Sequence, residues 1–290
     1  MNRAVKQFVA LGQIIWRKPE ALLFTGKRKE MRLTEEQLGT FETKGYLILR
    51  KFVEEEQCDT ILDIAKAHLK HKVPPIETET EYVGKSKEER EMISDGHAEQ
   101  REERITVRRL RQVYHRDIVF RQWMENEKIR PLLRQILGEG PVITIAHHNS
   151  IMTKMPQTST ETSWHQDIRY WRFKKDNLVS VWLALGEETD ENGVLEFIPG
   201  SHKMVFDPEQ FDEKEYFVEN EAKNRLLIET KEQTVLQKGD VVFFHSKLLH
   251  RANRNQTQEP KISFVYTVHG RSNHPLAGTR SSEYPEVILP

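Results

Sequence analysis

The segment KISFVYTV, residues 261–268, alternates between two kinds of side chain along its whole length. The odd-numbered positions include Lys261 and Ser263, whereas the even-numbered positions, from Ile262 to Val268, are all large and apolar. Successive side chains of a β-strand point to opposite faces of a sheet. A period of two therefore predicts a strand with one face in a hydrophobic core.

Short strands are also expected in the rest of the second half of the chain, whereas helices are expected in the first half. Further strands are expected at residues 141–154, 178–185, 194–198, 234–236 and 241–244. Helices are expected at residues 34–43, 54–70 and 121–137, and Thr34 with Gln37 fits a capping box at the start of the first. This order predicts a mainly β fold, a sandwich or barrel, with a helical layer against it.

Composition narrows the class of protein. The chain has 290 residues, a length at which barrel and sandwich enzymes commonly fold as one domain. Its 44 Lys and Arg nearly balance 45 Asp and Glu, which gives no reason to expect nucleic acid or an anionic membrane as a partner. No apolar run approaches the roughly 18 residues of a membrane-spanning helix. The single cysteine, Cys58, excludes an intramolecular disulfide and favours a reducing, cytoplasmic location.

We divide the chain into an N-terminal arm, residues 1–33, and a single domain, residues 34–290, whose β core is residues 141–269. The arm is basic and amphipathic, which indicates a helix packed on the domain or, alternatively, a transit segment or a surface-binding helix. Residues 76–104 hold ten acids and five bases with no apolar period. Such a run predicts a charged loop, which is also a candidate lid over an active site.

A candidate metal site begins in the segment Ser163-Trp164-His165-Gln166-Asp167. In a strand, residues two apart share a face, so His165 and Asp167 would offer an imidazole nitrogen and a carboxylate oxygen to one ion. His250 follows the predicted strand at residues 241–244 and is the best candidate for a third ligand. Two histidines and one carboxylate form the facial triad of non-haem Fe(II) oxygenases, which leaves coordination positions open.

Together these motifs resemble the phytanoyl-CoA dioxygenase family of iron- and 2-oxoglutarate-dependent oxygenases. The matching pieces are Trp164-His165-Gln166-Asp167 with Tyr170-Trp171, Glu191-Asn192-Gly193, Pro199-Gly200-Ser201-His202, and residues 239–244 leading to His250 and Asn255. The resemblance extends from about Thr34 to Thr267. It implies a double-stranded β-helix, the jelly roll of cupin-like proteins, at residues 141–269 with the N-terminal helices packed on it.

The resemblance also implies an activity. His165, Asp167 and His250 would hold Fe(II) as the catalytic centre, with 2-oxoglutarate and O2 as cosubstrates. 2-Oxoglutarate would be decarboxylated to succinate and CO2 while a C–H bond of a small organic substrate is hydroxylated. Halogenating relatives carry a small residue in place of the aspartate, so Asp167 favours a hydroxylase over a halogenase.

Contacts to the cosubstrate are implied at three positions. The family usually places an arginine about eleven residues after the distal histidine, where it binds the far carboxylate of 2-oxoglutarate. This chain has Lys261 there, which offers a point charge in place of a bidentate fork. We interpret Lys261 as that residue. Trp182 and Met152 lie approximately where relatives contact the cosubstrate, and core packing is the alternative for both.

Other polar residues are weaker candidates. Arg169 and Tyr170 follow the first two ligands closely and are candidate substrate contacts, with surface exposure as the alternative for Arg169. Three arginines are candidates for a further cosubstrate contact: Arg108, Arg109 and Arg111. Four histidines are expected to be structural or to support the ligands: His147, His148, His202 and His245. His147 and His148 are adjacent, so in a strand they would face opposite ways and could not both bind one metal. A place for one of them at the pocket is the alternative to a structural role.

Two further functions fit the same residues. A non-catalytic jelly-roll protein that binds or regulates, and that has lost the use of 2-oxoglutarate, is favoured by Lys261. A metal-dependent hydrolase could use the same ligands without oxygen. The sequence predicts neither the identity of the small-molecule substrate nor the oligomeric state.

Overall fold

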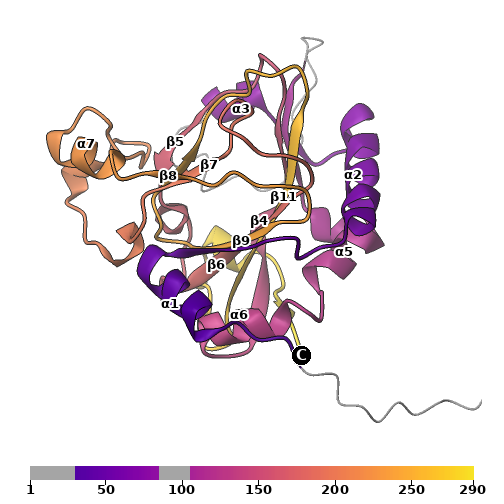
Figure 1. Ribbon diagram of the computed structural model, residues 1–290, viewed down its shortest axis with the longest axis horizontal. Coiled ribbons are helices and arrows are strands. Elements are labelled where there is room, and N and C mark those ends of the chain that lie inside the picture. Colours follow the sequence, from indigo (N-terminus) through magenta and orange to yellow (C-terminus); the bar gives the residue numbers. More distant parts are fainter. Residues whose placement is uncertain (1–29, 85–104) are drawn as a thin grey trace, which may run out of the picture. The chain divides into compact units, whose positions relative to one another are not determined.

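Two antiparallel sheets form the centre of the computed structural model, which describes residues 30–84 and 105–290 (Figure 1). In the described residues, the larger sheet has the order β1 (Tyr46–Leu49), β9 (Val241–His245), β6 (Leu178–Ala184), β11 (Lys261–Gly270), β4 (Pro141–Lys154), β3 (Val107–Arg111) and β2 (Ile76–Thr78), and β12 (Val287–Ile288) pairs with β4. The smaller sheet is β5 (Thr162–His165), β10 (His250–Ala252), β7 (Leu195–Phe197) and β8 (Glu232–Gln233). The predicted jelly roll is confirmed.

Helices from residues 35–70 and 118–137 cover one face of the larger sheet. The α-helices of the described residues are α1 (Glu35–Lys44), α2 (Glu55–Lys70), α3 (Glu79–Gly84), α5 (Ile118–Met124), α6 (Arg130–Leu137) and α7 (Ala222–Ile228). Short 3₁₀ turns are η1 (Val113–His115), η2 (Asp167–Tyr170), η3 (Ser201–Lys203), η4 (Pro208–Gln210) and η5 (Arg280–Ser282). The capping box of α1 is present, because the Gln37 amide donates to Thr34 Oγ1 and the Thr34 amide donates to Gln37 Oε1.

The alternation of β11 separates two hydrophobic clusters. Phe264 and Tyr266 join the large cluster that contacts the helices, together with Val181 of β6. Val265, on the opposite face, joins a second cluster with Trp182 and residues of the smaller sheet. The first cluster therefore fixes the helices to the larger sheet, and the second fills part of the space between the two sheets.

Three expected elements differ in detail. The helix expected at 121–137 is two helices, because Pro131 in the first turn of α6 has no amide hydrogen to continue a helix from α5. The strand expected at 234–236 lies at 232–233, and Leu236 makes only an isolated bridge to Glu188. Within the range 76–104, expected as a charged loop, residues 76–84 instead form β2 and α3, with β2 held by pairing with β3.

Residues 31–290 form one compact unit. Most of the predicted arm and residues 85–104 lie outside the described residues, so the arm and the lid stay predictions. None of the helices in residues 30–84 and 105–290 combines the length and the apolar surface needed to span a bilayer.

Alanine substitutions at two glycines, Gly239 and Gly138, test how closely the larger sheet approaches the segment that leads into α2. Gly239 has φ +88°, and a Cβ there would lie 2.3 Å from the Val53 carbonyl oxygen, whereas a Cβ at Gly138, with φ +75°, would meet nothing within 4 Å. Both Ala variants lose the left-handed preference of glycine, which costs about 1 kcal/mol or more. We expect Gly239→Ala to lower the free energy of unfolding by at least about 1 kcal/mol more than Gly138→Ala, measured by urea denaturation. Equal losses would contradict the close approach.

Candidate metal centre

Strand pairing brings the two predicted histidine ligands together. β10 pairs antiparallel with β5, and His250 lies directly opposite His165, with a distance of 4.2 Å between the ring centroids. His250 follows the strand expected at 241–244, but not directly at its exit: that strand, β9, ends at His245, and His250 begins β10 in the other sheet. The chain changes sheets between them, which places His250 beside β5.

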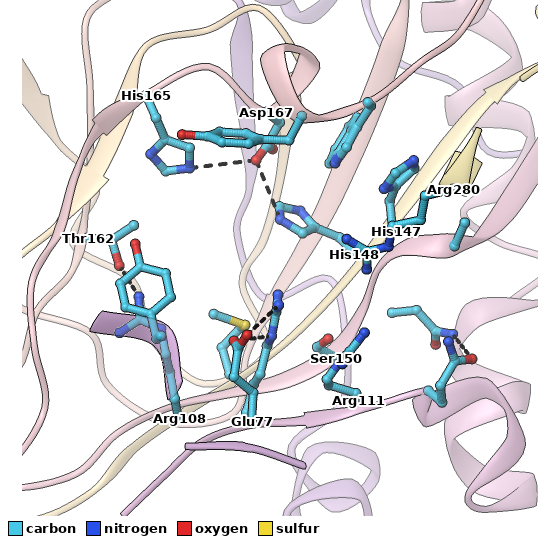
Figure 2. A pocket seen from close by; sticks show the side chains of 18 of the residues that line it. Glu77, Arg108, Arg111, His147, His148, Ser150, Thr162, His165, Asp167 and Arg280 are labelled. Carbon is cyan, nitrogen blue, oxygen red and sulfur yellow. Dashed lines mark hydrogen bonds and ion pairs between the residues drawn. The ribbon is translucent and has the colours of Figure 1, made fainter. Parts of the chain in front are cut away.

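Asp167 reaches the same point by a different route from the one expected. It begins the 3₁₀ turn η2 instead of continuing β5, because the chain turns after Gln166, whose side-chain amide donates to the Lys247 carbonyl. The two-residue strand spacing therefore does not apply. The Asp167 side chain nevertheless points toward both histidines, as Figure 2 shows for His165. Asp167 Oδ1 lies 3.6 Å from His165 Nε2 and 3.8 Å from His250 Nε2.

Hydrogen bonds at the far side of each ring define the tautomers. Nδ1 of His165 lies 2.8 Å from the Ser163 carbonyl oxygen, and Nδ1 of His250 lies 2.9 Å from the Leu248 carbonyl oxygen. A carbonyl oxygen can only accept, so each Nδ1 carries the proton and donates it. In the neutral rings the Nε2 lone pairs then face Asp167. This is how protein histidines are usually held when they bind a metal.

The protonation states of His250 and Asp167 favour a bound cation. Burial lowers the pKa of His250 to about 3, with His165 adding to the effect, so the ring is neutral near pH 7. Burial by itself raises the pKa of Asp167, but the surrounding His148, His250 and His165 outweigh it and hold that pKa well below its usual range. Asp167 Oδ2 is buried and has no hydrogen-bond partner among the described residues. Two nitrogen lone pairs and a carboxylate facing one point fit a divalent ion such as Fe(II).

Among the described residues, His165, Asp167 and His250 are the group of ligand atoms close enough to share an ion, all within 4.8 Å of one another. The sequence had named these three residues, and the structure brings them together.

His148 also reaches the centre, a position that the simple strand pattern missed. The pairing of β4 with β11 is interrupted between Asn149 and Thr144, where the register shifts. Such a bulge breaks the alternation of faces. Consequently His147 and His148 both line the larger cavity. His147 contacts Ser281 and stacks on Trp171, while His148 Nε2 lies 3.4 Å from Asp167 Oδ1 (Figure 2). His148 is therefore placed to orient the Asp167 carboxylate.

A larger cavity opens beside the centre. His165 and Asp167 lie at one side of it, and Glu77, Arg108 and Arg111 lie at the opposite side (Figure 2). Arg108 donates to Thr162 and pairs with Glu79 at 3.0 Å.

The two candidate substrate residues have different positions. Tyr170 lines the larger cavity, and its hydroxyl donates to the Lys214 carbonyl. Arg169 is not among the residues that line it; its guanidinium pairs with Glu215 at 2.5 Å and lies over the Phe211 ring. Arg169 thus holds the segment around Phe211–Glu215 in place. Contact of either residue with a substrate stays a prediction.

A smaller cavity connects the centre with the three predicted cosubstrate residues. His165 and His250 line it together with Met152, Trp182 and Lys261. Trp182 also belongs to the hydrophobic cluster between the sheets, so packing and a place at the cavity are compatible. The cavity therefore runs from candidate metal ligands to a buried ammonium, an arrangement suited to an acid that chelates the metal and carries a second carboxylate.

Two charged residues had no signal in the sequence: one lines this cavity, and the other lies behind its wall in contact with Lys261. Lys154 lines it, and its ammonium donates to the Thr160 and Ala252 carbonyls; burial lowers its pKa well below the usual range, with Arg108 and Lys261 adding to the effect. Glu188 is fully buried and pairs with Lys261 at 3.1 Å. Glu188 stands in a charged turn sequence, GEETDENG, that reads as solvent-exposed. Only the pairing of distant strands brings it to Lys261.

The family profile described as phytanoyl-CoA dioxygenase (PhyH) matches residues 41–263. The chain belongs to this family. It is 32% identical over 130 residues to the peroxisomal phytanoyl-CoA dioxygenase of Bos taurus, a match that covers 41% of this chain and 37% of that protein. The chain thus spans less than two fifths of the length of that relative.

Solved structures show the same fold. EctD from S. alaskensis with 2-oxoglutarate and 5-hydroxyectoine has a TM-score of 0.64 at 20% identity, covering 84% of this chain and 78% of that one. The epimerase SnoN in complex with Fe3+, alpha ketoglutarate and nogalamycin RO has a TM-score of 0.66 at 18% identity, covering 88% and 94%. Both were solved with 2-oxoglutarate, and SnoN with iron. Cytoplasmic location stays a prediction, since the bovine relative is peroxisomal.

Removal of either histidine ligand tests the metal site. We expect His165→Ala and His250→Ala each to weaken Fe(II) binding by at least about 100-fold, because each removes one of three ligands. Anaerobic titration followed by measurement of retained iron checks this. His202→Ala is the control, since the His202 ring contacts His245 and lies outside both cavities. Unchanged iron binding in both ligand variants would contradict the assignment.

His245 gives a prediction for pH. Burial lowers its pKa from the ordinary 6.5 to about 3, with His202 and Lys247 adding to the effect. The unfolded chain therefore takes up this proton first, and the stability contribution is complete above about pH 6.5 and is lost as the pH falls toward 3. We expect the metal-free protein to lose roughly 1 kcal/mol of unfolding free energy per pH unit in that window from this residue.

Urea denaturation at several pH values would measure that slope. His245→Gln should reduce it by about the contribution of this residue, and the same substitution at the exposed His274 should leave it unchanged. The same slope in both variants would contradict the assignment to His245.

Proposed function

We propose that the protein is an Fe(II)/2-oxoglutarate-dependent dioxygenase that hydroxylates a C–H bond of a small organic molecule, with release of succinate and CO2. The observation that carries the proposal is the convergence of His165, Asp167 and His250 at the junction of two cavities. Family membership supports the use of iron and 2-oxoglutarate. The carboxylate of Asp167 supports hydroxylation over halogenation, because it fills the position that a halide would need.

Bound together, Fe(II) and 2-oxoglutarate supply with O2 the oxidant for an unreactive C–H bond. The chain's own residues prepare the site. The carbonyls of Ser163 and Leu248 fix the rings of His165 and His250, so that each Nε2 can hold the metal. Lys261 would receive the far carboxylate of 2-oxoglutarate in the smaller cavity.

Exclusion of water follows from the walls of the smaller cavity. Trp182, Phe244 and Val265 line it and belong to the buried cluster between the sheets. The larger cavity shares His165 with the smaller one and is also lined by Asp167. It is the candidate place for the substrate, with Tyr170 at its wall. Separate cavities for cosubstrate and substrate let both lie against one metal.

The structural neighbours include an enzyme named as an epimerase, so the reaction type needs its own test. Substrate screening should use acyl-CoA esters, amino-acid derivatives and natural products, scored by succinate release. Incorporation of one atom of isotopically labelled dioxygen into the product would support hydroxylation. Succinate release with an unlabelled product that is isomerised or cyclised would contradict it. A non-catalytic binding protein would release no succinate with any substrate.

A simple reconstitution tests the oxygenase itself. We expect anaerobic addition of Fe(II) and 2-oxoglutarate to give the weak visible charge-transfer band of the chelate, and oxygen to then convert 2-oxoglutarate to succinate. His165→Ala should lose both signals, because the chelate needs the complete triad, whereas the control His202→Ala should keep both. Absence of the band in the unaltered protein would refute 2-oxoglutarate use. Activity that needs neither oxygen nor a keto acid would indicate a hydrolase.

A further inference from the structure

Glu188 is a buried carboxylate in contact with the lysine that faces the smaller cavity. It is fully buried in the turn region between β6 and β7. Its Oε2 accepts from Lys261 Nζ at 3.1 Å, and its Oε1 accepts from Trp182 Nε1 at 3.0 Å and from Ser263 Oγ at 2.6 Å. Three donors and two carboxylate oxygens match, so this position is built for an acidic side chain.

Lys261 keeps capacity for a ligand in spite of this pair. Its ammonium donates to Glu188 and, at 2.7 Å, to the Gly193 carbonyl. An ammonium has three N–H donors, so one remains for an acceptor in the cavity that Lys261 lines. The two protein acceptors fix where the ammonium lies, which a flexible lysine would not do by itself.

The same contact offsets the charge of the lysine. A carboxylate 3.1 Å from the ammonium makes the pair nearly neutral when seen from the cavity. Two other cations at this cavity are matched in the same way, Arg108 by Glu79 and Arg251 by Glu196. Within residues 30–84 and 105–290, the hydrogen-bond partners of the Lys154 ammonium are two backbone carbonyls. The cavity therefore attracts a second carboxylate less strongly than its count of basic side chains suggests.

We propose that Glu188 is a positioning residue that holds Lys261 toward the cavity and moderates its attraction for the distal carboxylate of the cosubstrate. Glu188 thereby sets how strongly the site prefers a dicarboxylic to a monocarboxylic 2-oxo acid. The inference rests on the proposed use of a 2-oxo acid. It concerns the distal carboxylate alone, because Glu188 is not among the residues that line the cavity.

The role of Glu188 can be tested by measuring the affinity of four protein variants for two 2-oxo acids. 2-Oxoglutarate and 2-oxopentanoate share a five-carbon chain and the metal-chelating group, but only the first has a distal carboxylate. We would measure Kd for both by anaerobic titration of the iron-loaded protein, following the chelate absorption and, independently, the heat of binding. The proteins are the unaltered chain, Glu188→Gln, Lys261→Met and the double variant. Gln keeps the shape and an acceptor oxygen while removing the charge.

We expect Glu188→Gln to bind 2-oxoglutarate at least about fivefold more tightly, since a buried negative charge no longer opposes the distal carboxylate. Lys261→Met should bind it at least about tenfold more weakly, because the carboxylate then meets Glu188 without its partner cation. The double variant should lie between the two single variants. For 2-oxopentanoate, all four Kd values should agree within about twofold.

The outcomes are distinguishable. If Glu188→Gln leaves the ratio of the two Kd values unchanged, or shifts both ligands equally, Glu188 is a packing residue and the inference is wrong. If Glu188→Gln alone fails to fold because Lys261 is left buried without its partner, the comparison of Lys261→Met with the double variant decides the same question. If no protein binds either acid while iron is retained, the proposed function itself fails, and the inference with it.

Discussion

The pairing of β5 with β10 is the constraint on which the site depends. It sets His165 opposite His250 and leaves their Nδ1 atoms to donate to the carbonyls of Ser163 and Leu248. Both Nε2 atoms then face Asp167, which enters from the 3₁₀ turn after β5. Because the two strands belong to the smaller sheet, any change that shifts their register would separate the ligands. The larger sheet and its helices hold the smaller sheet at the right distance through the cluster that contains Trp182 and Val265.

Charge is the second organising feature. The space between the sheets holds several buried ions, which are costly unless they are paired. The chain pairs Lys261 with Glu188 and Arg108 with Glu79, and it leaves Asp167 Oδ2 without a hydrogen-bond partner among the described residues. The unpartnered Asp167 oxygen coincides with the candidate metal ligands, whereas Lys261 and Arg108, the cations of these two ion pairs, line the smaller cavity, the proposed place of the cosubstrate. Buried charges that must be paired for the fold to be stable therefore lie beside the carboxylate that is the candidate metal ligand.

Much of the architecture could be predicted, because it depends on local patterns. The period of two in β11 and the capping box of α1 each act within a few residues, and both elements form where expected. Predictions that extrapolated a local pattern across a break were wrong in detail. Asp167 is not in the strand of His165, and the adjacent His147 and His148 both reach the larger cavity. A turn and a bulge, each stabilised by contacts with distant segments, override the strand period there.

By itself, the sequence determined a mainly β fold with a helical layer and the identity of the three candidate ligands, since apolar periodicity and metal-ligand chemistry are properties of residue types and their order. The jelly roll followed from the resemblance of the motifs to a known family. Only the tertiary structure decided which atoms of those ligands face one another, that His148 reaches Asp167, and that Lys261 is matched by Glu188. Lys261 and Glu188 are 73 positions apart, and the charged sequence around Glu188 gives no sign of burial. Pairing between distant strands creates that contact, and a short-range sequence pattern does not contain it.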